Sequence, residues 1–260
     1  FDAVDTAIGF KISELCFNGT EADLKLTANT QPAILTVSAA AAAVLRHHGI
    51  NPDVVAGHSL GEYSALVAAG AMPVTEAASA VHARGTFMQE AVPPGDGAMA
   101  AVLGLAPEKV AEICEQVAEE TGRVCAPANY NEPKQTVIAG SAGAVEVAMG
   151  KLKEAGAKRV LPLPVSAPFH CAMMTPVRPR LKAVLEKIAW QPMRVPVVSN
   201  VEAKATQNPT QLTHLLVEQV TSPVRWIECV EEMARMGVTR MVEVGPGRVL
   251  SGLVKRIDDS

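Results

Sequence analysis

The stretch Asp53-Val54-Val55-Ala56-Gly57-His58-Ser59-Leu60-Gly61 decides the fold class of this sequence. Its apolar start predicts a strand over 53–56, and the residues from Leu60 to about Gly70 follow a helical pattern. Between them stands a G-x-S-x-G motif, in which a serine at a sharp strand-to-helix turn exposes its hydroxyl. The first N–H groups of a helix have no acceptor within it, so the N–H of Leu60 is the natural donor to an oxyanion formed at Ser59. A chance G-x-S-x-G among 19 glycines is the alternative, and the flanking strand and helix disfavour it.

A serine nucleophile needs a base, and six histidines are available. His170 differs from the others because it lies in the Pro-bracketed, non-helical segment 164–170, directly after a predicted strand. Catalytic groups commonly lie on loops that a rigid scaffold positions. His58 adjoins the serine, but chain neighbours at such a turn point in different directions, so we expect it to pack or to fix the loop. We therefore predict that His170 is the base for Ser59.

Arg84 is the third candidate, since it is the only cationic residue between Arg46 and Lys109. It lies in an apolar predicted helix with Phe87 and Met88 on the next turn. A lone arginine in such a run is commonly a surface group whose stem packs on apolar neighbours. Inside a cleft, its guanidinium would instead bind a carboxylate through two hydrogen bonds. The residues alone leave both interpretations open.

A second block of elements follows the run Pro93-Pro94-Gly95-Asp96-Gly97, the clearest boundary signal in the sequence. The elements predicted there are strands at 98–103, 124–128, 135–139 and 159–165, helices at 107–121 and 144–155, and a turn at 129–134. Their β-α-β-β-α-β order is that of the ferredoxin-like arrangement, although the same strands could extend a main sheet. The elements predicted around this block are a helix that opens at Thr30-Gln31-Pro32, helices near 73–92, 175–189, 211–220 and 227–236, and strands at 195–201 and 240–244. The sequence therefore predicts a larger α/β domain interrupted by a smaller inserted one.

Composition excludes several classes of protein. The 260 residues are 48% hydrophobic and 19% charged, which excludes a disordered chain, and only 3% are aromatic, which disfavours a surface that stacks nucleic-acid bases. Five cysteines with no C-x-x-C pair indicate neither disulfides nor a zinc site, so we expect a reducing, cytoplasmic compartment and no metal. The longest uncharged stretch, 26–45, contains too many polar residues for a membrane span, and we expect no membrane partner.

The charge is distributed unevenly along the chain. Residues 1–130 contain 6 Lys and Arg against 15 Asp and Glu, a balance of −9, and residues 131–260 contain 17 against 12, a balance of +5. Two ordinary solvated faces would explain this difference. The functional alternative is a positive surface, built by the second half, that binds an anionic partner.

Several segments resemble the bacterial malonyl-CoA:acyl carrier protein transacylases. The resemblance covers nearly the whole chain, in order and at plausible spacing. Its segments are Gly57–Leu66, Arg84-Gly85 with Phe87–Ala91, Gly97–Ala101, Pro162–Cys171, Asn200-Val201, Glu243–Gly247 and Lys255-Arg256. Together these motifs are far more specific than a single G-x-S-x-G.

The resemblance implies a role for each matching residue. Ser59 would be the nucleophile, His170 its base, and Arg84 the group that binds the free carboxylate of malonyl. Gln219 matches the position that orients the histidine through a hydrogen bond. Phe169, which resembles the malonyl-selecting version of its segment, and Met88 would set acyl selectivity.

The resemblance also implies an architecture and partners. The fold would be an α/β-hydrolase-like core, residues 1–95 and 167–260, with a ferredoxin-like subdomain at 96–166. The enzyme would need no tightly bound cofactor and would transfer malonyl from malonyl-CoA to an acidic acyl carrier protein, as a cytoplasmic monomer. Arg178, Arg180, Lys182 and Lys187 are candidate contacts with that carrier.

The sequence departs from the family at its N-terminal end, and this departure leaves two alternative functions open. The family begins with a buried strand that leads into a Gly-Gln-Gly-Ser-Gln motif, whereas residues 1–5 resemble a later helix, so we expect one oxyanion donor and one central strand to be missing from this sequence. A non-catalytic module that binds carrier proteins is therefore one alternative. A serine thioesterase or hydrolase with the same turn is the other.

Overall fold

The stretch around Ser59 forms a strand, a sharp turn and a helix in the computed structural model, which describes residues 1–165 and 167–258. Strand β1 (Val55–Ala56) leads through the turn into α5 (Leu60–Ala69). β1 pairs in parallel with β6 (Val197–Val198), and β6 pairs antiparallel with β7 (Ala205–Thr206). The strands predicted at 53–56 and 195–201 are therefore present, although each is shorter than predicted.

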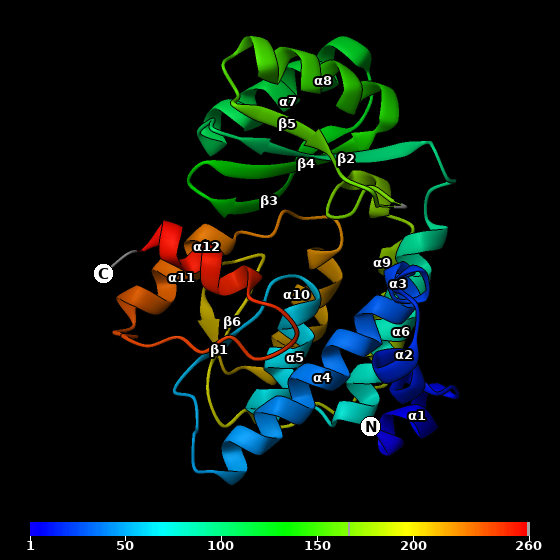
Figure 1. Cartoon of the computed structure of the whole chain (residues 1–260), viewed down its shortest axis with the longest axis vertical. Helices are drawn as coiled ribbons and strands as arrows, with labels where there is room; N and C mark the ends of the chain where they lie inside the picture. Colours follow the sequence, from blue (N-terminus) through cyan, green and yellow to red (C-terminus); the bar gives the residue numbers. More distant parts are fainter. Residues whose placement is uncertain (166, 259–260) are drawn as a thin grey trace.

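Helices surround this small sheet (Figure 1). Most of their buried residues are small or aliphatic, and they form two apolar clusters, a larger one that contains Leu66 and Leu181 and a smaller one that contains Val198 and Trp226. The helices of this part are α1 (Asp2–Ile8), α2 (Ile12–Asn18), α3 (Glu21–Lys25), α4 (Thr27–His47), α5, α6 (Val74–Glu90), α9 (Val177–Leu185), α10 (Leu212–Gln219), α11 (Trp226–Arg235) and α12 (Val249–Ile257), with 3₁₀ turns at Ala172–Met174 and Pro209–Gln211.

Helix α4 begins earlier than predicted. The sequence placed Pro32 in its first turn, but the helix starts at Thr27 and Pro32 lies inside it. A proline has no N–H to donate to the carbonyl four residues earlier, here that of Ala28. His82 of α6 takes that place, since its Nδ1 lies 2.9 Å from the Ala28 oxygen. A partner from α6 thus stabilises an interior proline that sequence reasoning took for a helix start.

By length and composition, α4 is also apolar enough to cross a bilayer, a test that core helices pass as well. Within the fold it packs along α6 and α5. Its residue Leu35 is fully buried in the apolar core.

The second block forms a separate four-stranded sheet. Its elements are β2 (Gly97–Leu103), α7 (Pro107–Thr121), β3 (Cys125–Glu132), β4 (Gln135–Ser141), α8 (Ala142–Glu154) and β5 (Arg159–Pro162), in the predicted order. The strand order is β3-β4-β2-β5, and all neighbouring strands are antiparallel. The turn between β3 and β4 is shorter than the predicted 129–134, because β3 continues to Glu132.

The two faces of this sheet bury different groups, as alternation along a strand requires. Ala100 and Val102 pack with the apolar residues of α7 and α8. Met99 and Ala101 share a second cluster with Cys171, against which Phe169 packs. The segment that bears His170 is therefore held against the sheet face opposite to α7 and α8.

The strand predicted at 240–244 is wrong. Residues 238–244 have no strand structure, and Met241 and Val242 are 38% and 59% exposed. A strand needs a hydrogen-bonded neighbour, and within the described residues β1 pairs with β6 alone. The segment 240–244 therefore remains irregular.

Backbone hydrogen bonds join the two sheet regions. The N–H of Tyr130 in β3 donates to the carbonyl of Val224 over 2.9 Å, and the N–H of Val224 donates to the carbonyl of Ala128 over 2.9 Å. Arg256 of α12 also forms an ion pair with Glu132 of β3. Figure 1 shows the four-stranded sheet and its two helices at one end of the molecule, with β3 on the side that faces the rest.

Candidate active site

Ser59 sits in a strained turn between β1 and α5. Its φ of 52° and ψ of −104° are unusual for a residue other than glycine. Such strain persists where the surrounding structure fixes it, commonly at active sites. At Gly57, a Cβ atom would lie 2.0 Å from the backbone of Gly61, so this position admits only glycine. At Gly61 an added Cβ would meet nothing within 4 Å, so the protein itself sets no such limit there.

Asn200 holds this turn from the loop that follows the neighbouring strand β6. Its Oδ1 accepts a hydrogen bond from the N–H of Ser59 over 2.7 Å, and its Nδ2 donates to the carbonyl of Gly57 over 2.7 Å. The side chain is fully buried, and both bonds go to the backbone on either side of His58. Asn200 therefore fixes the conformation that aims the Ser59 hydroxyl.

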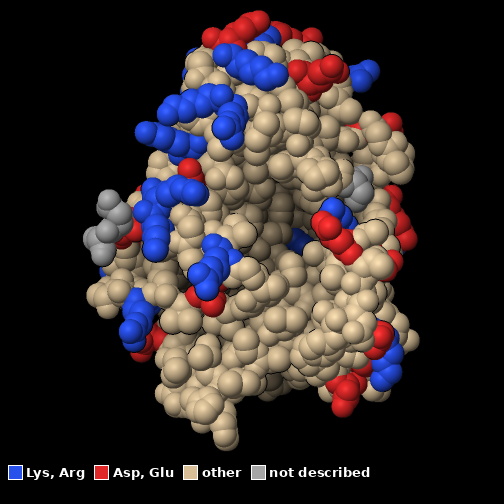
Figure 2. Space-filling model, in the orientation of Figure 1, with Lys and Arg blue, Asp and Glu red and all other residues tan. Residues whose placement is uncertain are grey.

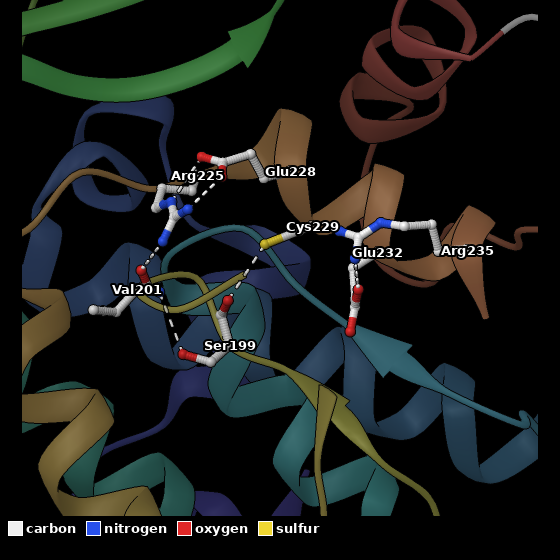
Figure 3. A network of polar contacts seen from close by, with 7 residues as sticks. All are labelled: Ser199, Val201, Arg225, Glu228, Cys229, Glu232 and Arg235. Atoms are coloured by element: carbon white, nitrogen blue, oxygen red, sulfur yellow. Dashed lines mark hydrogen bonds and ion pairs between the residues drawn. The ribbon is translucent and has the colours of Figure 1, made fainter. Parts of the chain in front are cut away.

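Helix α11 anchors the loop that bears Asn200 (Figure 3). Arg225, paired with Glu228, donates from Nη1 to the carbonyl of Val201 over 3.0 Å, and its N–H donates to the carbonyl of Asn200 over 3.1 Å. The Sγ of Cys229 donates to the carbonyl of Ser199 over 3.4 Å. The loop is thus tied to α11 before, at and after Asn200.

His170 lies against the nucleophile, as predicted. Its Nε2 is 2.7 Å from the Oγ of Ser59, and its Nδ1 is 2.8 Å from the main-chain carbonyl of Gln219. A carbonyl only accepts, so Nδ1 bears the proton and Nε2 is free to accept the hydroxyl proton. The hydrogen bond of His170 to Gln219 is thus made to the backbone of Gln219, and the role of this residue in orienting the histidine stays a prediction.

The electrostatic environment keeps His170 neutral. Burial, and after it the positive charge of Arg84, lowers the pKa of His170 to about 3. A histidine acts as a base only while it is unprotonated. The imidazole is therefore ready to accept a proton well below neutral pH.

Because of this lowered pKa, we expect the reaction rate not to fall near pH 6, as it usually does when a histidine base becomes protonated. The rate constant for acylation of Ser59, measured by rapid quench, should change by less than about twofold between about pH 6.5 and pH 5.5, whereas an ordinary histidine pKa of about 6.5 would lower it about fivefold. The His47→Ala variant, altered at an exposed histidine, should give the same profile. A midpoint near pH 6.5 in both proteins would contradict the expected environment of His170.

Arg84 is buried, so it is not the surface group that one of the two interpretations described. Only 1% of its surface is exposed, and its guanidinium donates to the Oγ of Ser59 over 3.0 Å, to Oε1 of Gln31 over 2.7 Å and to Oε1 of Gln219 over 2.9 Å. Gly85 permits this arrangement, because a Cβ there would lie 2.6 Å from the Thr27 carbonyl of α4, the helix that supplies Gln31. The cation is therefore held at the nucleophile.

The side chain of Gln219 links several groups of the site. Its Oε1 accepts from Arg84, and its Nε2 donates to the carbonyl of Ser59 over 3.0 Å and to Oε2 of Glu62 over 2.8 Å. Glu62, in the first turn of α5, also accepts from the N–H of Asn200 over 3.1 Å. Sequence reasoning assigned no role to Gln31, Glu62 or Asn200, although Glu62 stands in the quoted stretch Gly57–Leu66 and Asn200 in the quoted pair Asn200-Val201.

The three remaining predicted residues lie around this centre. Leu60 is the first residue of α5, so its N–H stands at the helix start beside Ser59. Met88 is buried, and its Sδ lies 3.9 Å from Nε2 of Gln31. Phe169 is half-buried and packs against two of the apolar clusters. Their roles in oxyanion binding and acyl selectivity stay predictions.

His58 behaves as the sequence indicated. Its Nε2 lies 2.8 Å from Oδ1 of Asn131 in β3, and its ring lies 5.8 Å from that of Trp226. The ring thus ties the turn to the four-stranded sheet.

The arrangement is suited to acyl transfer to and from Ser59. It combines a serine whose hydroxyl contacts a neutral base, an N–H group at a helix start, and a buried cation beside the nucleophile. Figure 2 shows one face of the molecule hollowed near its middle, between the four-stranded sheet and the helices, with lysine and arginine gathered along one side.

Comparisons with known proteins agree with this chemistry. The acyl transferase domain family matches residues 2–257. A malonyl CoA-acyl carrier protein transacylase of Escherichia coli O157:H7 is 48% identical, over 100% of this chain and 84% of that protein. An acyl carrier protein S-malonyltransferase from Vibrio cholerae superposes with a TM-score of 0.97 at 46% identity, covering 100% of this chain and 84% of the other. A malonyl-transacylase solved in complex with a type II PKS acyl-carrier protein gives 0.96 at 46% identity, with the same coverage.

Proposed function

The chain belongs to the acyl transferase domain family and, within it, to the malonyl CoA-acyl carrier protein transacylases, and we propose that it transfers malonyl from malonyl-CoA to the phosphopantetheine thiol of an acyl carrier protein. One observation supports this assignment most directly. The Oγ of Ser59 contacts both Nε2 of His170 and Nη2 of Arg84, so a base and a carboxylate-binding cation meet at one nucleophile.

In the first half of the proposed reaction, Ser59 becomes acylated. Nε2 of His170 takes the hydroxyl proton as Oγ attacks the thioester carbonyl. The C–S bond then breaks, and the coenzyme A thiolate takes the proton from His170 as it leaves. The product is a malonyl ester of Ser59 and free coenzyme A.

In the second half, the carrier thiol takes the acyl group. It gives its proton to His170 and attacks the ester carbonyl through sulfur. The C–O bond to Ser59 breaks, and Oγ recovers the proton from His170. In both halves the N–H of Leu60 is proposed to donate to the oxyanion of the tetrahedral intermediate.

Arg84 is proposed to bind the free carboxylate of malonyl. A guanidinium has paired donors that match a carboxylate, and the buried position strengthens the interaction. Arg84 donates to three neutral oxygens, and the substrate carboxylate would replace the contact with Ser59. Phe169 and Met88 are proposed to shape the acyl pocket, Met88 through its contact with Gln31.

We also propose a finer description of the fold. The parallel pairing of β1 with β6 and the turn at Ser59 support an α/β-hydrolase-like core, and the order β3-β4-β2-β5 supports a ferredoxin-like subdomain. The proposed domains are residues 1–95 and 167–260 for the core and 96–166 for the subdomain. Residues 166, 259 and 260, which include the end of the subdomain, lie outside the described residues.

An acidic acyl carrier protein is the proposed partner of a cytoplasmic monomer with no tightly bound cofactor. The solved complex of a relative with its acyl-carrier protein supports the choice of partner. The cations of α9 support it less, because Arg178 pairs with Glu218, Arg180 with Glu90 and Lys182 with Glu186. Their positive charge is largely balanced within the protein.

Intact-mass measurement after mixing with malonyl-CoA tests the proposed function. We expect a malonyl adduct on the wild-type protein that persists without an acceptor and disappears when acyl carrier protein is added. The Ser59→Ala variant should form no adduct. Release of malonate without an acceptor would identify a hydrolase instead, and an unmodified wild-type protein would identify a non-catalytic module.

A further inference from the structure

The buried charge of Arg84 has no direct anionic partner. Its three acceptors, from Gln31, Ser59 and Gln219, are all neutral, and no ion pair to it occurs within the described residues. Its Nε is buried without a hydrogen-bond partner. Because a buried cation is costly unless a nearby charge balances it, Arg84 needs a counter-ion.

Glu62 is placed to be that counter-ion. It is 3% exposed, and the amide of Gln219 stands between the two charges, accepting from Arg84 over 2.9 Å and donating to Oε2 of Glu62 over 2.8 Å. The same carboxylate oxygen accepts from the N–H of Asn200. The groups that face Glu62 are Arg84 of α6, Tyr63 of α5, Cys229 of α11, and the polar Ser199, Asn200 and Gln219. Arg84 is the one cation among them.

The orientation of Gln219 depends on Glu62. A carboxylate only accepts hydrogen bonds, so it draws the NH₂ end of the amide toward itself and leaves the oxygen for Arg84. The same NH₂ group donates to the carbonyl of Ser59. The charge of Glu62 is thus connected, through one side chain, to both the cation and the nucleophile.

We propose that Glu62 is a positioning residue, the counter-ion of Arg84 before substrate binds, which takes up a proton when a substrate carboxylate assumes that role. This inference rests on the proposed binding of malonyl to Arg84. Glu62 touches no reacting atom and acts through Gln219.

The sign of the resulting pH dependence follows from the surroundings of Glu62. Burial raises the pKa of Glu62 to about 7, against the hydrogen bonds from Gln219 and Asn200 and the charge of Arg84, which lower it. A substrate carboxylate cancels the effect of Arg84, so the pKa of Glu62 rises further in the complex. Well below pH 7 the carboxyl is protonated in both states and affinity is constant. Above pH 7 binding must add a proton, so affinity falls as pH increases, by at most about tenfold per pH unit.

The decisive measurement is the KM for malonyl-CoA between about pH 6.5 and pH 8.5. For the wild-type enzyme we expect KM to rise at least about threefold, and for Glu62→Gln, which keeps an accepting oxygen but has no charge, we expect it to stay constant. Acetyl-CoA has no free carboxylate and should show no such rise with the wild-type enzyme. Glu112→Gln, a matched change at an exposed glutamate of α7, should behave as the wild type does.

A second measurement does not depend on the folding of Glu62→Gln. Malonyl-CoA is titrated into Ser59→Ala at about pH 7.5 in two buffers of different ionisation enthalpy, and we expect uptake of more than about half a proton. Acetyl-CoA should give none. Proton uptake near zero with malonyl-CoA, or the same KM profile in wild type and Glu62→Gln, would overturn the proposal for Glu62. Absence of a malonyl adduct on the wild-type protein would instead overturn the proposed function.

Discussion

Replacing His170 by alanine is expected to lower the rate constant of Ser59 acylation by about 10²–10⁴-fold, the usual contribution of a positioned general base. The reason is geometric as well as electrostatic. Nε2 of His170 is the basic group 2.7 Å from the Ser59 hydroxyl, and its tautomer is fixed by the carbonyl of Gln219. The KM for malonyl-CoA should change much less, because Arg84, rather than His170, is proposed to bind the carboxylate. Rapid-quench measurement of the malonyl adduct gives both quantities.

Two variants define the range of this experiment. Ser59→Ala gives the background level of the malonyl adduct, since it has no hydroxyl to acylate. His47→Ala, at the exposed end of α4, should retain wild-type rates and controls for loss of a histidine as such. Acylation of His170→Ala at the wild-type rate would show that another group removes the proton.

Replacing Arg84 by alanine is expected to abolish most of the preference for malonyl over acetyl groups. A buried charged hydrogen-bonded pair contributes about 2–4 kcal/mol relative to a state in which one partner is left unpaired. That range corresponds to about a 30- to 1,000-fold loss in relative kcat/KM. The measurement is competition between malonyl-CoA and acetyl-CoA for the same enzyme, read as the ratio of the two adduct masses.

The ratio is informative even if the variant is less stable, because both substrates meet the same folded fraction. Arg84→Lys keeps the charge but not the paired donors, so it should recover part of the preference. Arg46→Ala, an exposed arginine of α4, should leave the ratio unchanged. A ratio equal to that of the wild type in Arg84→Ala would exclude Arg84 as the carboxylate-binding group.

The sequence could predict those parts of the site that depend on one local pattern. The G-x-S-x-G motif identifies Ser59 because the turn needs glycine at position 57, where the Gly61 backbone leaves no room. His170 stands out because prolines keep its segment from being helical. Arg84 stands out as a single charge in an apolar run, but whether it was buried depended on its neighbours in space.

The missed residues share a different property. Gln31 lies 53 positions before Arg84, and Asn200 lies 141 positions after Ser59, so no local pattern connects either with the site. Glu62 resembles an ordinary acidic residue in the first turn of a helix, where the helix dipole favours it. The strand predicted at 240–244 is wrong because a sequence pattern indicates only a tendency to form a strand. A strand also needs a neighbouring strand with which to form hydrogen bonds.

The hydrogen bonds between β3 and Val224 limit how the protein moves during turnover. His58 beside the nucleophile contacts β3 through Asn131, and Val224 follows shortly after Gln219, whose carbonyl contacts the base. A hinge between the four-stranded sheet and the rest of the molecule would therefore break bonds that hold both members of the Ser59–His170 pair. We therefore expect the acyl donor and the acyl acceptor to exchange without such a hinge motion, while the distance between Ser59 and His170 stays constant.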